Sequence, residues 1–389
     1  MSGLSGKAAI VGIGATDFSK NSGRSELRLA TEAVAAALTD AGLGPSDVDG
    51  LTSFTMDTNT ETAVARAVGI PELTFFSRTH FGGGAACATV QQAAMAVATG
   101  VAEVVVAYRA FNERSGMRFG QVRSDLVVNA DSSGTDNSFS YPHGLGTPAA
   151  TVAMMAQRYM HETGASSEDF GRIAVAARLH AANNPNAFFY GKPITLEDHQ
   201  NSRWIAEPLH LLDCCQESDG GVALVITSVE RARALRQPPV IIAAAAQGSG
   251  QDQFTMASYY RDSLGLPEMG LVGKQLWVQS GMRPDEMKMA VLYDHFTPYA
   301  LMQLEELGFC ARGEAKEFIA DGAIELGGRL PLNTHGGQLG EAYIHGMNGI
   351  AEGVRQIRGT SVNQVPGDAP VLVTAGTGVP TSAVVLACG

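Results

Sequence analysis

Residues 81–100 read FGGGAACATVQQAAMAVATG, a glycine turn that runs into a stretch of almost only small side chains. The stretch predicts a helix, and a helix with so few large side chains must pack closely on several sides. The run EVVVAY at 103–108 follows and predicts a buried strand. We therefore expect an α/β protein in which this helix lies at the centre and not on the surface.

The N-terminal region shows a strand followed by a helix. The apolar run AAIVGIG at 8–14 predicts the strand, and apolar residues at helical spacing predict a helix that stops at Gly42. The glycines of GIGATD resemble a dinucleotide-binding turn, but Asp17 stands where that turn requires its third glycine. Because a carboxylate there would repel a pyrophosphate, we do not expect a nucleotide site.

The second half of the chain follows the same plan. Buried strands are predicted at 239–246 and 289–293, a glycine turn with a helix at 336–354, and closing strands at 371–376 and 383–387. Two such halves indicate an internal duplication of an α/β unit. We expect an N-terminal half over 1–235, with an insertion over 111–205 that caps a site, and a C-terminal half over 236–389.

Composition limits the classes of function. With 389 residues, 45% hydrophobic and 17% charged, the chain has a large core to bury. Its net charge of -12 disfavours a general nucleic-acid surface, which needs a surplus of Lys and Arg. The five cysteines show no CxxC spacing, and neither a signal peptide nor a membrane-spanning run is present. We expect a reduced cytoplasmic protein without structural zinc.

Four motifs carry a resemblance to a known superfamily. EPLHLLDCC (207–215) is followed by SDGGVALVITS (218–228), the insertion contains YPHGLGTPAA (141–150), and NTHGG (333–337) lies near the end. In this order the motifs resemble the thiolase superfamily, especially its sterol-carrier-protein-type members. The resemblance covers nearly the whole chain. It implies an α/β thiolase fold, with duplicated halves in an αβαβα arrangement of layers and a loop-domain insertion.

The chain departs from the thiolase pattern at both oxyanion-hole motifs. In thiolases an Asn and a Gly-Gly pair precede a His-Pro-x-Gly; Asn333, Gly336, Gly337 and Gly346 match, but Tyr343 and Ile344 replace His-Pro. The other motif begins in thiolases with Asn or His, and in the YDHF of this chain it begins with Tyr293. Two polar positions of the resembled site are therefore tyrosines.

The cysteines of thiolase chemistry are also missing. Comparison with the family places the nucleophilic cysteine at Gly83, and Cys87 lies one helical turn later, where we interpret it as a buried, inert thiol. The second catalytic cysteine has no counterpart in residues 375–383, and Cys388 lies beyond that stretch. Without a thiolate no acyl-enzyme forms, so the chain is not expected to be a thiolase.

A retro-aldol cleavage suits a thiolase-like site that has two tyrosines and no catalytic cysteine. Removing the proton of a β-hydroxyl on an acyl thioester cleaves the carbon–carbon bond and leaves an enolate, which needs an oxyanion site and a proton donor. Tyr293 would accept the hydroxyl proton and Tyr343 would protonate the enolate, or the reverse, if His295 or His345 lowers a tyrosine pKa. The glycine turn at 333–346 is expected to direct backbone N–H groups toward the developing charge.

A narrower resemblance supports this chemistry. Tyr293, Tyr343 and the glycine in GGGAAC are similar to the actinobacterial steroid side-chain-cleaving aldolases, thiolase-fold subunits that work with a small OB-fold and zinc-ribbon protein. The resemblance implies cleavage of a 17-hydroxy steroid bearing a propanoyl-CoA side chain to a 17-keto steroid and propionyl-CoA. It further implies a homodimer that binds partner chains as a heterotetramer, with CoA as part of the substrate and no cofactor.

The expected site can be stated by residue. The catalytic residues are predicted to be Tyr293, Tyr343, His295, His335 and His345, and the substrate-binding residues Gly83, Asn333, Gly336, Gly337, His143, Asp294, Arg114 and Arg118. His143 and His335 either orient the thioester or hydrogen-bond the glycine loops. Arg114, Arg118 and Arg123 either meet CoA phosphates or form a solvated basic face.

Other functions were weighed against the aldolase. Asp294, His295, His335 and His345 match no standard metal-ligand spacing, so no metal site is predicted. Neither tyrosine motif contains a lysine for a Schiff base. The alternative from another class is a non-catalytic thiolase-like lipid carrier or scaffold, which loss of both cysteines would also produce.

Overall fold

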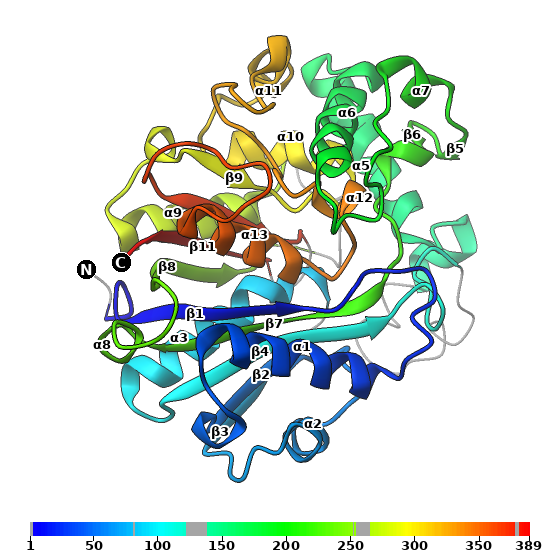
Figure 1. Cartoon of the computed structure of the whole chain (residues 1–389). Helices are drawn as coiled ribbons and strands as arrows, with labels where there is room; N and C mark the ends of the chain where they lie inside the picture. Colours follow the sequence, from blue (N-terminus) through cyan, green and yellow to red (C-terminus); the bar gives the residue numbers. More distant parts are fainter. Residues whose placement is uncertain (1–2, 81, 122–137, 252, 254–264, 378–380) are drawn as a thin grey trace.

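The structure is a computed structural model that describes residues 3–80, 82–121, 138–251, 253, 265–377 and 381–389. Within these residues nine strands form one mixed sheet in the order β3-β2-β4-β7-β1-β8-β11-β10-β9 (Figure 1). The strands are β1 (Ala8–Ala15), β2 (Gly50–Phe54), β3 (Phe75–Thr79), β4 (Val104–Asn112), β7 (Asp219–Ser228), β8 (Val240–Gly248), β9 (Met289–Val291), β10 (Val371–Ala375) and β11 (Thr381–Cys388). A separate two-stranded sheet pairs β5 (Trp204–Ala206) with β6 (Leu209–His210).

The described helices flank this sheet and separate its two parts. They are α1 (Glu26–Ala41), α2 (Glu61–Val68), α3 (Ala86–Thr99), α5 (Pro148–Thr163), α6 (Ser167–Asn183), α7 (Leu196–Asn201), α8 (Val229–Ala232), α9 (Pro267–Ser280), α10 (Thr297–Glu306), α11 (Ala315–Phe318), α12 (Gly337–Gly340) and α13 (Met347–Arg358).

The two halves of the sheet meet where β1 pairs antiparallel with β8, through Ala9 opposite Ile241 and Ile10 opposite Val240. Helix α3 packs against β2, β4 and β7 of the first half and also against β8 and β11 of the second. Helix α13 likewise contacts strands of both halves. The prediction of a central helix within 81–100 is therefore confirmed, and its small side chains permit close contact with both halves of the sheet.

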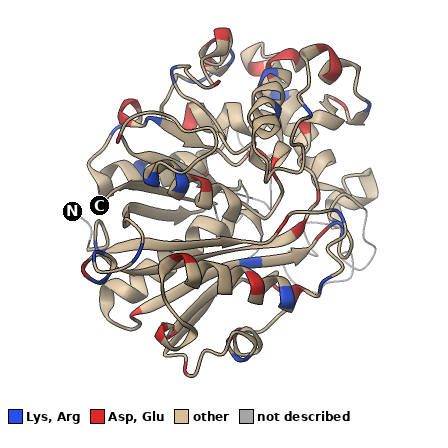
Figure 2. Ribbon diagram, viewed as in Figure 1, with Lys and Arg blue, Asp and Glu red and all other residues tan. Residues whose placement is uncertain are grey.

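The outer layers complete the expected αβαβα arrangement. Helix α1 covers the outer face of β1, β7 and β4, while α9 covers β8 and β11 (Figure 1). The apolar core divides accordingly into a central cluster around α3 and α13, a second beneath α1, and a third beneath α9, α10 and the insertion. Acidic and basic residues lie mainly on helices and connecting segments outside this core (Figure 2).

Helix α1 shows how local sequence sets an element. The Ser25 hydroxyl accepts a hydrogen bond from the Arg28 N–H at 3.2 Å, and the helix ends at Gly42 with a left-handed φ of 73°. The glycines of β1 serve packing, because a Cβ on Gly14 would lie 2.3 Å from the Ala37 nitrogen. Asp17 forms an ion pair with Arg24 at 2.7 Å. The glycines of the GIGATD segment therefore allow helix α1 to pack closely on strand β1, which gives them a structural role.

The segment between β4 and β7 carries α5, α6, α7, β5 and β6. Its helix α6 contacts α10 and α12 of the C-terminal half. A Cβ on Gly336 or on Gly340 would lie 2.6 Å from the Ala181 Cβ, so the glycines let α6 rest directly on the turn that precedes Tyr343. The insertion therefore holds the glycine turn in place. In the described part of the chain, no helix is long and apolar enough to cross a membrane.

Candidate active site

The structure joins the two predicted tyrosines. Tyr293 follows β9, Tyr343 follows α12, and their hydroxyl oxygens form a hydrogen bond at 2.9 Å. Tyr293 is 2% exposed, whereas Tyr343 keeps part of its surface accessible. Each hydroxyl can donate one proton and accept another, so the pair forms a short path along which a proton can move.

Gly83 lies directly against this pair. A Cβ built on Gly83 would lie 1.9 Å from the Tyr293 hydroxyl oxygen and 2.4 Å from its Cζ. The phenol of Tyr293 therefore occupies the space that a side chain at position 83 would need. A cysteine at position 83 and this tyrosine are sterically exclusive, which explains why the two departures from the thiolase pattern occur together.

Neither the buried thiol of Cys87 nor the half-buried thiol of Cys215, which lies near the pair, is prepared for nucleophilic attack. Burial raises the pKa of the Cys87 thiol, whose Sγ donates to the Val373 carbonyl oxygen at 3.6 Å. Burial, followed by the charge of Glu113, also raises the pKa of the Cys215 thiol well above its usual value. Both sulfurs stay protonated at neutral pH, in line with the predicted inert role of Cys87.

The expected lowering of a tyrosine pKa by histidine is wrong. Burial raises the pKa of both Tyr293 and Tyr343 well above 10.0, and nearby Cys215 and Glu113 raise each further. Burial also lowers the pKa of His295 to about 3 and that of His345 well below 6.5. Neutral imidazoles supply no positive charge that would stabilise a phenolate, so both phenols keep their protons.

The residues of the glycine turn mostly bind one another. The Asn333 Oδ1 accepts from the Leu292 N–H at 2.8 Å, and the Asp294 Oδ1 accepts from the Gln338 N–H at 2.7 Å. Gly337 has a φ of 66°, and a Cβ there would lie 2.0 Å from the Asp294 Oδ2. Asp294 and Asn333 thus shape the turn instead of facing the tyrosine hydroxyls.

Three backbone N–H groups of the turn are also occupied. Gly336 donates to the Asn333 carbonyl at 2.8 Å, Glu341 donates to the Gly337 carbonyl at 3.0 Å, and Tyr343 donates to the Ser218 Oγ at 3.1 Å. These three groups are not free to meet developing negative charge, and the expectation stays a prediction for the other N–H groups of the turn. The bonds of the three groups instead fix the backbone that carries Tyr343.

The three predicted histidines lie in different environments. The His295 ring centroid is 4.7 Å from that of Tyr293, and the His345 ring centroid is 4.7 Å from that of Tyr343. His335 is buried beneath the turn, where its Nε2 lies 3.9 Å from the Glu341 Oε2. The structure thus brings His295 and His345 to the pair, and it places His335 beside a carboxylate.

Three further buried residues were missed by the sequence analysis. Arg109 of β4 is fully buried and pairs with Asp57 at 2.6 Å, while its Nε lies 3.4 Å from the His345 Nδ1. Glu113, directly after β4, is 2% exposed, and burial and then Glu217 raise its pKa well above 4.5. The available signal was an arginine inside the apolar run VVVAYRAFN at 104–112.

The other predicted ligand residues belong to the insertion and the segment that follows β4. His143 is exposed in a short 3-10 turn at Tyr141–His143 of the insertion. Arg118 pairs with Glu217 at 2.6 Å, and burial and then Arg114 lower the pKa of Lys20, so these cations lie near one another. Arg123 lies outside the described residues.

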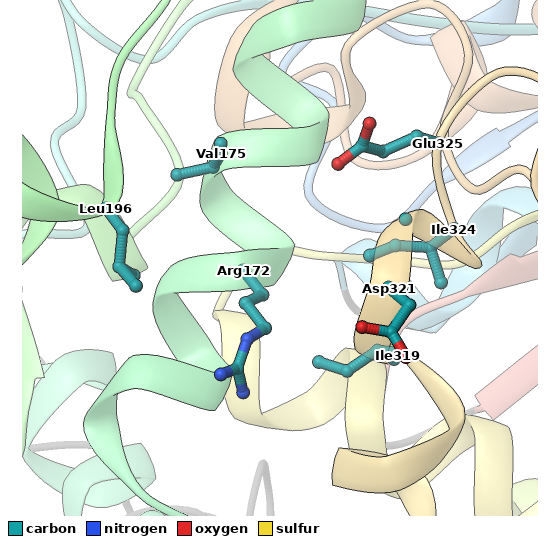
Figure 3. A pocket seen from close by; sticks show the side chains of 8 residues that line it. Arg172, Val175, Leu196, Ile319, Asp321, Ile324 and Glu325 are labelled. Carbon is teal, nitrogen blue, oxygen red and sulfur yellow. The ribbon is translucent and has the colours of Figure 1, made fainter.

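The described residues contain no group of three or more His, Cys, Asp or Glu side chains arranged to hold a metal ion. A surface pocket of about 190 Å³ lies between α6 and the segment at 319–325, with Arg172, Asp321 and Glu325 around it (Figure 3). It shares no lining residue with the tyrosine pair, and its mixed charges suit no single class of ligand.

A thiolase fold with a hydrogen-bonded phenol pair in place of the nucleophile defines a member of the thiolase superfamily that has changed its chemistry. Residues 250–388 match the Thiolase C-terminal domain-like family. The chain is 78% identical to the 17-hydroxy-3-oxo-4-pregnene-20-carboxyl-CoA lyase of Mycobacterium tuberculosis, over 98% of this chain and 100% of that protein. It is 70% identical to the steroid side-chain-cleaving aldolase of Thermomonospora curvata, over 99% of each.

The fold comparison agrees. The solved structure of the Ltp2-ChsH2(DUF35) aldolase superposes with a TM-score of 0.95 at 69% identity, covering 100% of this chain and 99% of that chain. The chain therefore belongs to the family of steroid side-chain-cleaving aldolases, a branch of the thiolase superfamily. It is a carbon–carbon lyase, and it keeps neither of the thiolase cysteines.

Proposed function

We propose that this chain catalyses the retro-aldol cleavage of a 17-hydroxy steroid with a propanoyl-CoA side chain, giving a 17-keto steroid and propionyl-CoA. The printed names of the relatives support the substrate class. The observation that carries the mechanism is the 2.9 Å hydrogen bond between Tyr293 and Tyr343 above Gly83. A non-catalytic carrier would not need two buried phenols in contact at this position.

The reaction takes one proton from the substrate and returns one to it, so two neutral phenols can serve without any net change in their protonation. The hydroxyl proton leaves the substrate, the carbon–carbon bond breaks, a carbonyl forms, and the electron pair passes into the thioester enolate. The enolate carbon then takes one proton, so the net change moves a proton from oxygen to carbon. Phenols with raised pKa values are poor isolated bases, but a pair in contact can accept one proton while releasing another.

We assign Tyr293 to the hydroxyl proton and Tyr343 to the enolate carbon, and the reverse assignment would use the same contact. As the hydroxyl proton reaches one phenol oxygen, that phenol passes its own proton across the 2.9 Å hydrogen bond. The second phenol releases its proton to carbon. Neither oxygen carries a full negative charge at any stage, which is consistent with the burial that opposes a phenolate.

We propose that CoA enters only as part of the substrate and that no cofactor is needed. The cations of Lys20, Arg114 and Arg118 are the described candidates for its phosphates, since burial and then Arg114 lower the pKa of Lys20 and an anion would offset the repulsion among the three. Arg118 already has Glu217 as a partner at 2.6 Å. A phosphate would therefore compete with that carboxylate or bind beside it.

For assembly we propose a homodimer that binds a small OB-fold and zinc-ribbon partner as a heterotetramer. The name of the Ltp2-ChsH2(DUF35) aldolase indicates that this relative works with a DUF35 chain. Strand β3 forms one edge of the described sheet, and its Phe76 is 60% exposed, which suits pairing between two copies. We propose the cytoplasm as its compartment because all five cysteines are unpaired.

The function can be tested with the purified chain, alone and with its co-expressed DUF35 partner. Each preparation is incubated with the 17-hydroxy steroid propanoyl-CoA thioester and with the matched thioester that lacks the 17-hydroxyl. We expect equal amounts of propionyl-CoA and 17-keto steroid from the first thioester and none from the second. Release of free CoA without the ketone would contradict the retro-aldol reaction.

A further inference from the structure

A buried line of three residues leads from the interior of the sheet to the tyrosine pair. Asp57, after β2, pairs with the Arg109 Nη1 at 2.6 Å, and the Arg109 Nε lies 3.4 Å from the His345 Nδ1. The Asp57 and Arg109 side chains are 2% and 0% exposed. The Arg109 guanidinium also lies 4.3 Å from the Phe111 ring centroid. These contacts leave the guanidinium little freedom to turn.

Arginine at this place determines the tautomer of His345. A guanidinium remains charged and can only donate, so the His345 Nδ1 facing it must be the acceptor. In a neutral imidazole whose Nδ1 accepts, the proton is carried by Nε2. The adjacent positive charge also opposes a second proton on the ring. His345 is therefore a neutral hydrogen-bond donor through Nε2 and has no free lone pair with which to act as a base.

The donor atom points to the reacting centre. A Cβ built on Gly82 would lie 3.3 Å from the His345 Nε2, and one on Gly83 would meet the Tyr293 hydroxyl at 1.9 Å. The imidazole donor and the phenol thus converge on two consecutive glycines. Among the hydrogen bonds of the described residues, His345 takes part through Nδ1 and not through Nε2. His345 has a φ of 50°, an uncommon value for a non-glycine residue and consistent with a conformation kept for its direction.

We propose that Arg109, held by Asp57, is a positioning residue that fixes His345 as an Nε2–H donor, and that this donor stabilises the thioester oxygen as the enolate forms. The inference rests on the proposed retro-aldol function, because only that function places an enolate beside Gly82 and Gly83. An oxyanion must be met by donors already in place, and the N–H groups of Gly336, Glu341 and Tyr343 are occupied by other acceptors.

A matched pair of substitutions tests the role of the donor. His345→Gln keeps an N–H donor near the position of Nε2, whereas His345→Asn keeps only a group near Nδ1. Asn tolerates a positive φ better than most residues, so backbone fit favours the Asn variant. We expect His345→Gln to retain cleavage within about tenfold of the native rate, and His345→Asn to lose roughly 100-fold or more, the cost typical of an oxyanion donor. Equal losses in the two variants would overturn the proposed donor.

A second experiment tests Arg109 through pH. The double variant Asp57→Asn with Arg109→Gln replaces the ion pair by two neutral amides, the second of them smaller than the arginine, so no buried charge is left unpaired. Without the guanidinium, His345 can place its proton on Nδ1, and the donor is then lost. Protonation of the ring restores the N–H on Nε2. We therefore expect a rate deficit at neutral pH that shrinks only as the pH falls well below 6.5, because burial still opposes a second proton on the ring after the guanidinium is removed.

The groups around His345 make this signature specific. Titratable and charged groups face it from β4, from the segments after β2 and β9, and from its own turn; they are Arg109, Asp57, His295 and Tyr343. Burial raises the pKa of Tyr343, so Tyr343 does not titrate in the acid range, and His295, with a pKa of about 3, is present in the native chain as well, whose rate over the same pH range is the control. A deficit independent of pH, or no deficit at all, would overturn the positioning role.

Failure of this inference is distinguishable from failure of the function. If both tyrosine-to-phenylalanine variants cleave the thioester at native rates, the retro-aldol mechanism is wrong whatever the His345 variants do. If the tyrosine variants are impaired while the Gln and Asn variants behave alike, the mechanism stands and only the donor assignment falls. Thermal unfolding of each variant, compared with the native chain, confirms that rates are compared among folded proteins.

Discussion

At the scale of single residues, the site depends on Tyr293 filling the space next to Gly83. Tyr293 extends its phenol into the space that a side chain at Gly83 would occupy, and the 1.9 Å separation leaves no room for both. The same phenol then lies within 2.9 Å of the Tyr343 hydroxyl. One pair of changes thus removes the nucleophile and installs a proton path. The motif comparison predicted both tyrosines and Gly83, but only the structure shows that they are in contact.

The tyrosine pair gives the most direct prediction. Replacing Tyr293 or Tyr343 by Phe removes one oxygen and keeps the ring, so packing should survive while the proton path is broken. We expect each single variant to lose between about 100-fold and 10,000-fold in the rate of propionyl-CoA release. The Tyr293→Phe, Tyr343→Phe double variant should lose little more than the worse single variant, because the two act as a unit. Multiplicative losses would indicate independent roles.

Cys87 provides the opposite test. The Cys87 thiol is buried in α3 and its raised pKa keeps it protonated, so we assign this side chain a role in core packing and none in catalysis. Cys87→Ala should keep most of the cleavage rate and cost about 1 kcal/mol or less in unfolding free energy, since one small group is removed. Stopped-flow or discontinuous assays of product release, with urea unfolding as the control, give both numbers. A loss of three orders of magnitude in a folded variant would return the chain to thiolase chemistry.

At the scale of elements, the sequence predicted what local signals determine. The strand at 8–14 and the helix end at Gly42 were confirmed because apolar periodicity and a left-handed glycine act over a few residues. The tyrosine pKa values were predicted with the wrong sign, since burial depends on segments far apart in the chain. The contact between Arg109 and His345 joins positions separated by 236 residues and follows no local pattern.

The contact between α6 and α12 leads to a prediction about Tyr343. A Cβ on Gly340 would lie 2.6 Å from the Ala181 Cβ, so Gly340→Ala should push α6 and the turn apart. We expect a loss of about 1–3 kcal/mol in stability, the usual cost of overpacking, together with a lower cleavage rate as Tyr343 shifts. Urea unfolding and product release measure the two effects.

A compensating change makes this prediction specific to the contact. Ala181→Gly removes the opposing methyl group, at a cost of roughly 1 kcal/mol for glycine within a helix. In the Gly340→Ala background it should nevertheless restore part of the cleavage rate, with a favourable coupling energy in the double-mutant cycle. Additive effects of the two substitutions would show that α6 does not set the position of the turn.

At the scale of the whole molecule, the sheet leaves an edge that a second copy can use. Strand β3 pairs with β2 on one side and is the last strand of the described sheet on the other. An unpaired edge with an exposed aromatic residue favours association, and most such associations between identical chains are two-fold symmetric. The small side chains of α3, which also contacts β3, fix this edge to the same core that carries Gly83.

The final prediction concerns this edge. Phe76 is 60% exposed on β3, so Phe76→Glu should place a carboxylate opposite its copy in a symmetric pair and weaken dimerisation by mutual repulsion and lost apolar burial. Light scattering across a concentration series should show a dimer for the native chain and a shift toward monomer for the variant. Val278→Glu on α9, where Val278 is 81% exposed, adds the same charge far from the edge in sequence and should leave the dimer intact. A native chain that stays monomeric at every concentration, or equal behaviour of the two variants, would rule out β3 as the dimer interface.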